Sequence, residues 1–264
     1  CNLQPAHLPP MTSYTDLCTS YIVNGAREAL AQVQESRGRV PERVRAQAWH
    51  LLDYALAVDA AWPQVRELLL ELAPKMEMAG YRDEWQPFLL AGIQRSGELA
   101  DQQVEARLKL AVGQLLRLEN RYAEAEKWLE QALTSFRNGD DRQGTAAAHN
   151  QLGRVCYLQR RDEEAIDHAG TALELLGPDE LERAESHFVL GMVALNQRQW
   201  KIAEEQQLLA LEVRHRAGDR RVLAWAMQYV GVVLLQQSEY GHVDRLDEAA
   251  GWLEDAIAHL DGRP

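Results

Sequence analysis

Apolar residues recur at intervals of three and four positions along most of the chain, and polar residues occupy the positions between them. This spacing places the apolar side chains on one face of an α-helix and leaves the opposite face to solvent. Two neighbouring stretches carry such stripes, at Leu108, Val112, Leu115 and Leu116 and at Trp128, Leu129 and Leu133. The pattern therefore predicts amphipathic helices that bury one face against each other.

A glycine recurs in each of four consecutive helical stretches, with spacings of 40, 38 and 40 residues between Gly113, Gly153, Gly191 and Gly231. Two alanine columns follow the same step, the last one lengthened by about six residues, at Ala125, Ala165, Ala203 and Ala249 and at Ala132, Ala172, Ala210 and Ala256. A glycine inside a helix costs about 1 kcal/mol relative to alanine, so its recurrence requires a packing reason. Small residues let antiparallel helices approach closely. The columns predict an all-α fold, an α-solenoid of antiparallel helix hairpins.

An aspartate stands twelve residues before each glycine of the column and is placed to cap the incoming helix, at Asp101, Asp141, Asp179 and Asp219. A degraded copy precedes these four repeats. We therefore divide residues 62–264 into about five repeats, which are 62–101, 102–141, 142–179, 180–219 and 220–264. Residues 1–61 show no clear repeat, and we expect them to form a degenerate helical hairpin that caps the array. Its helices are expected from Tyr14 to about Glu35 and from Pro41 to Asp59.

The three columns resemble the tetratricopeptide repeat (TPR) family, whose signature is a small residue at position 8 and alanines at positions 20 and 27. The resemblance covers residues 62–264. It implies a right-handed superhelix whose concave groove, lined by the first helix of each repeat, binds a protein or peptide. The period near 40 residues exceeds the family's 34, so each helix is expected to be longer by nearly a turn.

A second resemblance lies between Ala55 and Gln94, in the runs Asp59-Ala-Ala-Trp-Pro63 and Ala79-Gly-Tyr-Arg-Asp-Glu-Trp85. This segment is similar to the helical region that precedes TPR arrays in bacterial STAND-type signalling ATPases. No Gly-x-x-x-x-Gly-Lys-Ser/Thr sequence occurs in the chain, so it carries no phosphate-binding loop of that kind. The resemblance implies the sensor half of a larger signalling ATPase.

Composition and charge narrow the function classes. The 264 residues carry a formal net charge of −12, which argues against nucleic-acid binding because that requires a basic face. No run of 18 apolar residues occurs, so no transmembrane segment is expected. The three cysteines, Cys1, Cys18 and Cys156, form no ligand cluster. They are interpreted as reduced thiols of a cytoplasmic protein, the alternative being a lipid anchor on Cys1.

No arrangement of residues typical of catalysis is found, so we predict no enzyme activity, no cofactor and no metal site. His149 and His187 both lie four residues before a column glycine, and we interpret them as packing positions that recur with the repeat. Cys156 faces the predicted core and is interpreted as a small apolar filler.

The groove positions implied by the TPR register contain the candidate binding residues. Arg107, Arg117 and Arg154, with Asn150, form a basic polar stripe suited to a carboxylate or phosphate. An apolar half follows at Phe188, Met192 and Trp225, and Tyr157 and Gln228 complete the candidates. In the alternative interpretation, the arginines pair with local glutamates and the aromatic residues pack between tightly wound repeats.

Three functions remain open at this stage. The first is a non-catalytic interaction or sensor domain that binds a peptide, protein or small effector in the groove. The others are a free-standing peptide-responsive TPR regulator and a structural assembly adaptor, in one version a lipoprotein. The last helix keeps an apolar face, at Trp252, Leu253, Ile257 and Leu260, which more repeats or a second chain would cover.

Overall fold

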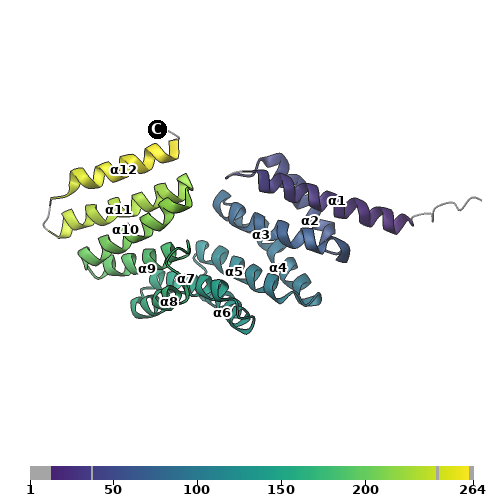
Figure 1. Ribbon diagram of the computed structural model, residues 1–264, viewed down its shortest axis with the longest axis horizontal. Helices are drawn as coiled ribbons and strands as arrows, with labels where there is room; N and C mark the ends of the chain where they lie inside the picture. Colours follow the sequence, from purple (N-terminus) through teal and green to yellow (C-terminus); the bar gives the residue numbers. More distant parts are fainter. Residues whose placement is uncertain (1–12, 37, 242–243, 262–264) are drawn as a thin grey trace, which may run out of the picture. The chain divides into compact units, whose positions relative to one another are not determined.

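The computed structural model describes residues 13–36, 38–241 and 244–261. Every regular element in this part of the chain is helical, which confirms the all-α prediction (Figure 1). The elements are α1 (Tyr14–Glu35), α2 (Glu42–Ala55), the 3-10 turn η1 (Asp59–Ala61), α3 (Trp62–Ala79), α4 (Arg82–Glu98), α5 (Gln102–Leu118), α6 (Tyr122–Asn138), α7 (Arg142–Leu158), α8 (Asp162–Leu175), α9 (Arg183–Asn196), α10 (Trp200–Ala217), α11 (Arg220–Tyr240) and α12 (Leu246–Asp261).

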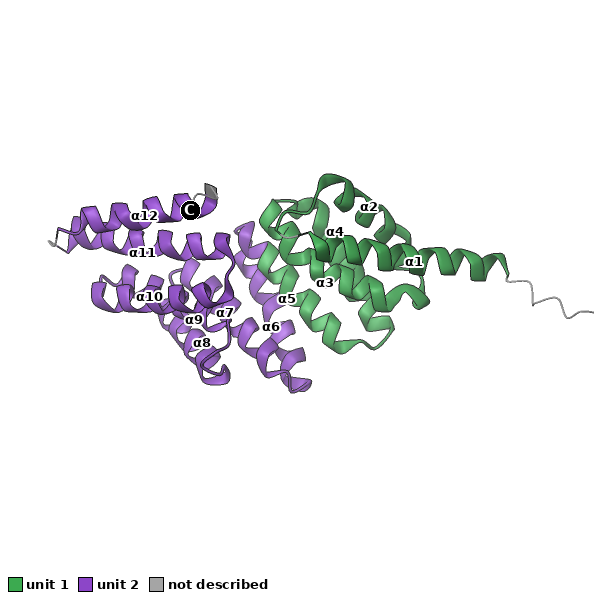
Figure 2. Cartoon of the chain, turned by 45° about the horizontal axis from the view of Figure 1, so that its top comes forward, with its two compact units in different colours: residues 1–115 green, residues 116–264 purple. Residues whose placement is uncertain are grey.

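The chain divides into two compact units, residues 1–115 and 116–264, and the boundary falls within α5 (Figure 2). In unit 1, α1 packs against α2 and α3, and α3 packs against α4. In unit 2, each helix packs against the next, and the closest partners are α7 with α8, α9 with α10 and α11 with α12. The division of the sequence into a cap and five repeats stays a prediction, because helix boundaries alone do not define repeats.

The first two helices follow the sequence closely. Helix α1 has the predicted bounds and begins with a capping box, in which Ser13 and Asp16 each accept a hydrogen bond from the other's backbone N–H. Helix α2 ends at Ala55, before the predicted Asp59, because η1 intervenes. Pro63 then lies in the first turn of α3, where its missing N–H costs no hydrogen bond.

Three of the four predicted aspartate caps are confirmed. Asp141 accepts from the N–H of Gly144 (2.8 Å) and caps α7. Asp219 does the same for α11, and Asp101 accepts from the N–H of Val104 at 3.4 Å. These bonds satisfy backbone donors at the start of a helix that otherwise have no partner.

The cap predicted at Asp179 is wrong. Helix α9 begins only at Arg183, and Asp179 instead pairs with Arg216 at the protein surface (3.0 Å). The chain turns at Pro178 and Asp179 after α8 has ended, which delays the next helix by several residues. The spacing of 38 residues that follows Gly153 in the column is therefore accommodated by a different turn.

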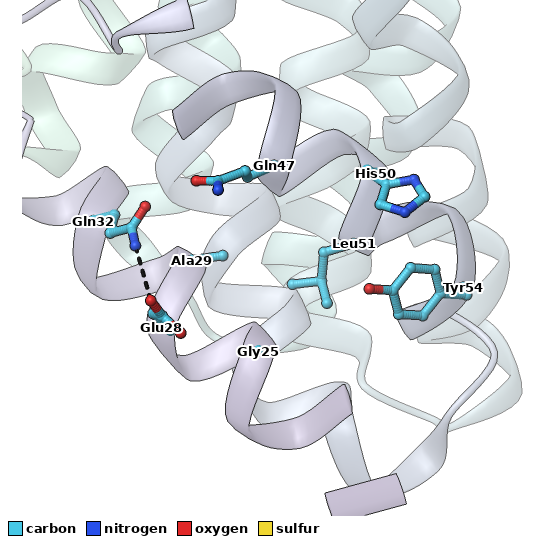
Figure 3. Close-up of a pocket in the computed structure, with 8 residues that line it drawn as sticks. All are labelled: Gly25, Glu28, Ala29, Gln32, Gln47, His50, Leu51 and Tyr54. Atoms are coloured by element: carbon cyan, nitrogen blue, oxygen red, sulfur yellow. Dashed lines mark hydrogen bonds between the residues drawn. The ribbon is translucent and has the colours of Figure 1, made fainter. Parts of the chain in front are cut away.

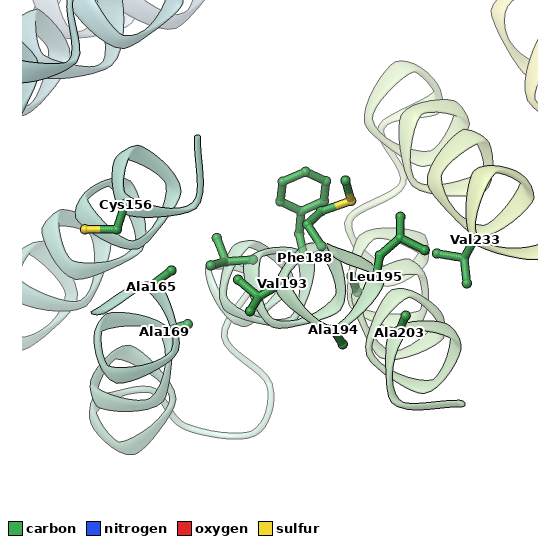
Figure 4. Packing of buried hydrophobic residues seen from close by; sticks show 12 residues of the cluster. Cys156, Ala165, Ala169, Phe188, Val193, Ala194, Leu195, Ala203 and Val233 are labelled. Atoms are coloured by element: carbon green, nitrogen blue, oxygen red, sulfur yellow. The ribbon is translucent and has the colours of Figure 1, made fainter. Parts of the chain in front are cut away.

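The small-residue columns lie at the closest helix contacts. All eight alanines of the two columns are buried. A Cβ atom on Gly153 would lie 3.2 Å from the carbonyl oxygen of Ala165, and one on Gly231 would lie 3.3 Å from that of Ala249. The backbones of the two helices in a hairpin therefore touch, as the columns predicted. Figure 4 shows the core that results in unit 2, where Cys156, Ala165 and Ala203 are packed around α9.

Arginines at the start of the second helices form bridges between neighbouring hairpins. Arg161 donates to Glu164 on its own helix α8 (2.8 Å) and to Glu126 on α6 (2.9 Å). Arg245 repeats the arrangement with Glu248 on α12 (2.8 Å) and Glu204 on α10 (2.6 Å). We call these two contacts the inter-repeat arginine bridges.

Several turns between helices use a left-handed residue that is not glycine. These residues are Ala100, Asn120, Asp140, Arg160 and Arg198, with φ between 51° and 64°. A residue with a Cβ atom in this conformation costs roughly 1–2 kcal/mol, although asparagine tolerates it better.

We expect Ala100→Gly to raise the free energy of unfolding by up to about 1 kcal/mol, because the strain at φ 55° disappears and part of the gain is lost to the more flexible unfolded chain. Asn120→Gly is the control and is expected to give no gain, since the Asn120 side chain also accepts a hydrogen bond from the hydroxyl of Tyr122 (2.7 Å). Urea unfolding followed by circular dichroism measures both. An equal gain for both variants would contradict this account.

Candidate functional site

Three of the predicted groove residues meet in unit 2. Arg154 on α7 places its guanidinium carbon 4.7 Å from the ring centre of Phe188 on α9 and 5.1 Å from that of Trp225 on α11. The two rings are nearly parallel, with an interplanar angle of 10° and centroids 6.2 Å apart. A guanidinium over an aromatic face is attracted by the ring quadrupole. First helices from three successive hairpins thus contribute to one contact.

A half-buried carboxylate, that of Glu185, links two of the surrounding arginines. Glu185 accepts from Nη1 of Arg154 at 2.6 Å and from Nη2 of Arg214, near the end of α10, at 3.4 Å. Burial opposes the ionisation of Glu185, but the charges of Arg154 and Arg214 outweigh it, so the pKa of this carboxyl lies below its ordinary value. Burial also disfavours the charged form of Arg214 and thereby lowers the pKa of its guanidinium. We call Arg154, Glu185, Phe188, Arg214, Trp225 and Tyr229 the Glu185 cluster.

The residues of the cluster differ in exposure: Phe188 and Arg214 are buried, the others except Trp225 are half-buried, and Trp225 is exposed. Tyr229 packs edge-on against Phe188 and Trp225, with centroids 4.7 Å and 5.5 Å apart. Phe188 is 2% exposed, whereas Trp225 is 42% exposed. The indole of Trp225 is therefore the part of the cluster that solvent, or a partner, reaches directly.

The charges of the predicted basic stripe are partly neutralised. Arg117 is buried, and its charge also helps to lower the pKa of Glu185. The carboxylate of Glu185 thus interacts electrostatically with Arg154, Arg214 and Arg117. Pairing of arginines with a local glutamate, one of the two interpretations left open by the sequence, occurs here at Arg154. Arg107 is exposed and lies in unit 1.

The remaining predicted residues have different surroundings. Asn150 is buried and donates to the carbonyl oxygen of Glu182 (3.0 Å) while accepting from the hydroxyl of Ser186 (2.6 Å). Met192 is buried in the unit 2 core, and Tyr157 is half-buried against it. Gln228 is exposed on α11. The structure thus engages Asn150 and Met192 in packing between hairpins.

Arg214 was not among the predicted site residues, because the predicted groove positions lie only on the first helix of each repeat. A signal was present: Arg214 follows Ala203, Gln207 and Ala210 at helical spacing, on a stripe that is buried. A charged residue on a buried stripe requires a partner of opposite charge. That partner is Glu185, on the first helix of the same hairpin.

A pocket in unit 1 and the described cysteines lie outside the Glu185 cluster. A shallow pocket of about 250 Å³ lies between α1 and α2, where Leu51 lies between Gly25 and Tyr54 (Figure 3). Cys156 is buried, and burial raises the pKa of its thiol to about 11, which supports its interpretation as an apolar filler. Cys18 is exposed on α1, and Cys1 lies outside the described residues. No group of three or more His, Cys, Asp or Glu residues in the described ranges is placed to bind a metal.

Tandem antiparallel hairpins without a strand in the described residues define the class of α-solenoid proteins. Within this class, a model of the tetratricopeptide repeat family matches residues 104–177, so this segment consists of tetratricopeptide repeats, as the three columns predicted. No curated protein matches the sequence. No described helix combines the length and apolar character that crossing a membrane requires.

Solved structures extend the fold assignment over most of the chain. The crystal structure of BtubC (BKLC) from P. vanneervenii covers 93% of this chain and 93% of its own, with a TM-score of 0.59 at 16% identity. A Rap protein complexed with competence and sporulation factor covers 93% of this chain and 67% of its own (TM-score 0.57, 15% identity). A putative kinesin light chain from Podosopora anserina covers 74% and 93% (TM-score 0.51, 14% identity). The predicted TPR-like solenoid fold is thereby confirmed.

Proposed function

We propose that the chain is a non-catalytic interaction domain that binds a peptide or protein partner over the Glu185 cluster. The observation that carries the proposal is the exposed indole of Trp225, held over buried Phe188 and Arg154. Tryptophan, tyrosine and arginine are the residues that most often dominate binding energy at protein interfaces. TPR proteins are generally scaffolds of this kind.

Rigidity supports the same proposal. Trp225 has contacts on α9 and α11, and Arg154 is fixed by its ion pair with Glu185. A side chain that is already held loses little conformational freedom when a partner covers it, so more of its contact energy appears as affinity.

The wider context of the domain is also a proposal. The resemblance of residues 55–94 to STAND-type proteins supports the sensor half of a bacterial signalling ATPase that acts in the cytoplasm. The second candidate is a free-standing peptide-responsive regulator. It is supported by the similarity in fold, over 93% of this chain, to a Rap protein whose structure contains competence and sporulation factor.

The proposal predicts that Trp225→Ala weakens binding of a partner at least about thirtyfold, equivalent to about 2 kcal/mol, the loss typical of an interface hot spot. The partner is first isolated with the wild-type chain and identified by mass spectrometry. Isothermal titration calorimetry with the purified partner then measures the affinity of each variant.

Tyr240→Ala is the matched control, because Tyr240 is an exposed aromatic residue on the same helix and lies outside the cluster. Its affinity is expected to stay within about twofold of the wild type. Equal affinities for wild type and Trp225→Ala would contradict the proposed surface. A wild-type chain that retains no partner would contradict the proposed function itself.

A further inference from the structure

A chain of three basic side chains crosses unit 2 away from the Glu185 cluster. Nη2 of Arg137, in the last turn of α6, lies 3.0 Å from Nε2 of His149 on α7. Nδ1 of His149 lies 2.9 Å from Nδ1 of His168 on α8. His149 is only 5% exposed, and the two imidazole rings have centroids 5.1 Å apart.

These distances define where the protons are. A guanidinium only donates, so Nε2 of His149 accepts from Arg137 and carries no hydrogen. The proton of a neutral His149 must then reside on Nδ1, which donates to Nδ1 of His168. His168 in turn carries its proton on Nε2. Both histidines are neutral, and one added proton breaks a hydrogen bond of the chain.

The repeat provides a natural comparison. His187 occupies the position of His149 one repeat later, and its Nδ1 lies 2.8 Å from Oε1 of Gln206, the counterpart of His168. The counterpart of Arg137 is Leu175. The arginine is therefore specific to the earlier repeat, and a packing role shared by the two histidines does not account for it.

An open pocket of about 320 Å³ lies beside His149. Its polar lining comprises Arg137, Asp140, Arg142, Thr145, His149 and Thr171. The hydroxyls of Thr145 and Thr171 donate to backbone carbonyl oxygens at 2.7 Å and 2.9 Å. The donors left for a ligand are the guanidinium groups of Arg137 and Arg142, two positive charges against the single carboxylate of Asp140.

We propose that this pocket binds a small oxyanion, a carboxylate, phosphate or sulfate group, and takes up a proton on His149 as it does so. The oxyanion accepts from Arg137 and Arg142, which frees Nε2 of His149 from the Arg137 donor. Protonated Nε2 then donates to the oxyanion, while Nδ1 keeps its hydrogen bond to His168. The proton and the negative charge enter together, so neither is left unpaired beside two arginines.

The groups around His149 determine whether anion binding strengthens or weakens as the pH falls. Burial, followed by the electrostatic influence of His168 and Arg137, lowers the pKa of His149 to about 4. Burial also lowers the pKa of His168, whose other charged neighbours are Glu164, Arg161, Asp167 and Glu126. An anion next to Nε2 favours the charged imidazole and must raise the pKa of His149. By linkage, the anion binds more tightly as the pH falls.

The test uses sulfate as the probe, because its charge is constant over the pH range of interest. Long-range ¹H–¹⁵N spectra of the full chain follow each imidazole with sodium sulfate and with sodium chloride at equal ionic strength. We expect saturating sulfate to raise the pKa of His149 by about one unit, which corresponds to about tenfold tighter binding to the protonated form. His187 is the internal reference and is expected to show no shift.

Two variants separate this pocket from general screening. Arg142→Gln removes an exposed pocket arginine outside the histidine chain and is expected to abolish the sulfate effect without changing the pKa of His149 in chloride. Arg160→Gln removes an exposed arginine that does not line the pocket and is expected to behave as wild type. A wild-type pKa that sulfate leaves unchanged would overturn the proposal. So would an equal shift at His187, or a shift that survives in Arg142→Gln.

Discussion

Replacing Gly153 with leucine is expected to lower the free energy of unfolding by about 3 kcal/mol or more. A Cβ atom at Gly153 would lie 3.2 Å from the carbonyl oxygen of Ala165 and 3.3 Å from Cβ of His168. Both atoms belong to α8 near its backbone, so they move only if the whole helix moves. The remaining leucine atoms would then force α7 and α8 apart and expose the alanines between them.

The matched control is Gly170→Leu in α8. No atom lies within 4 Å of a Cβ built at Gly170, so leucine is accommodated there, and its higher helix propensity is expected to raise stability by up to about 1 kcal/mol. The same substitution thus has opposite signs at two glycines of one hairpin. Urea unfolding monitored by circular dichroism measures both. A Gly153→Leu protein as stable as wild type would contradict the close backbone contact that we assign to the glycine column.

The second large effect is expected at Glu185. Glu185→Gln keeps the shape and a hydrogen-bond acceptor but removes the negative charge that pairs with Arg154 and with buried Arg214. Breaking a buried ion pair in this way costs about 3–5 kcal/mol. Because the pKa of Glu185 is lowered, its ionisation stabilises the protein above the ordinary carboxyl range, and this contribution disappears as the pH falls through the folded-state value.

A second variant distinguishes loss of charge balance from loss of shape. Adding Arg214→Met to Glu185→Gln removes the least exposed guanidinium of the cluster and is expected to recover much of the stability, because apolar replacements of buried ion pairs are often neutral or better. Asp179→Ala, which breaks the exposed pair with Arg216, is the control and is expected to cost under about 1 kcal/mol. Thermal unfolding compares the series. If the double variant were no more stable than Glu185→Gln, unbalanced charge would not explain the loss.

Much of this fold is predictable because glycine and alanine recur at the same positions of each repeat, about every 40 residues. The glycine and alanine columns locate the contacts between helices. The aspartate caps are predictable because a cap depends only on the few residues at the start of its own helix. Prediction failed at Asp179, where the linker between α8 and α9 differs from the others. The geometry of this turn depends on the number of residues between the helices and on Pro178. The cap at Asp179 was predicted from the spacing in neighbouring repeats, which takes neither into account.

The site was predictable only in part for a related reason. Arg154, Phe188 and Trp225 share a register on first helices, so the repeat pattern brings them to one face. The partner of Arg154 is on the next repeat, and Arg214 reaches Glu185 from a second helix. The pairing of Arg154 with Glu185, across 31 residues, depends on how successive hairpins stack, and a pattern within one repeat does not contain that information.

The inter-repeat arginine bridges affect how cooperatively the helical array unfolds. A solenoid unfolds as a one-dimensional chain of coupled units, and its cooperativity depends on the interfaces between neighbours. Gln199 replaces the bridging arginine at the start of α10 and has no charge to link α10 to α8. There the two hairpins are joined instead through Arg154 and Glu185, on the side of the first helices. Partial unfolding that starts at either end of unit 2 would thus reach, at the Glu185 cluster, an interface that the Arg154–Glu185 pair links in place of an arginine bridge.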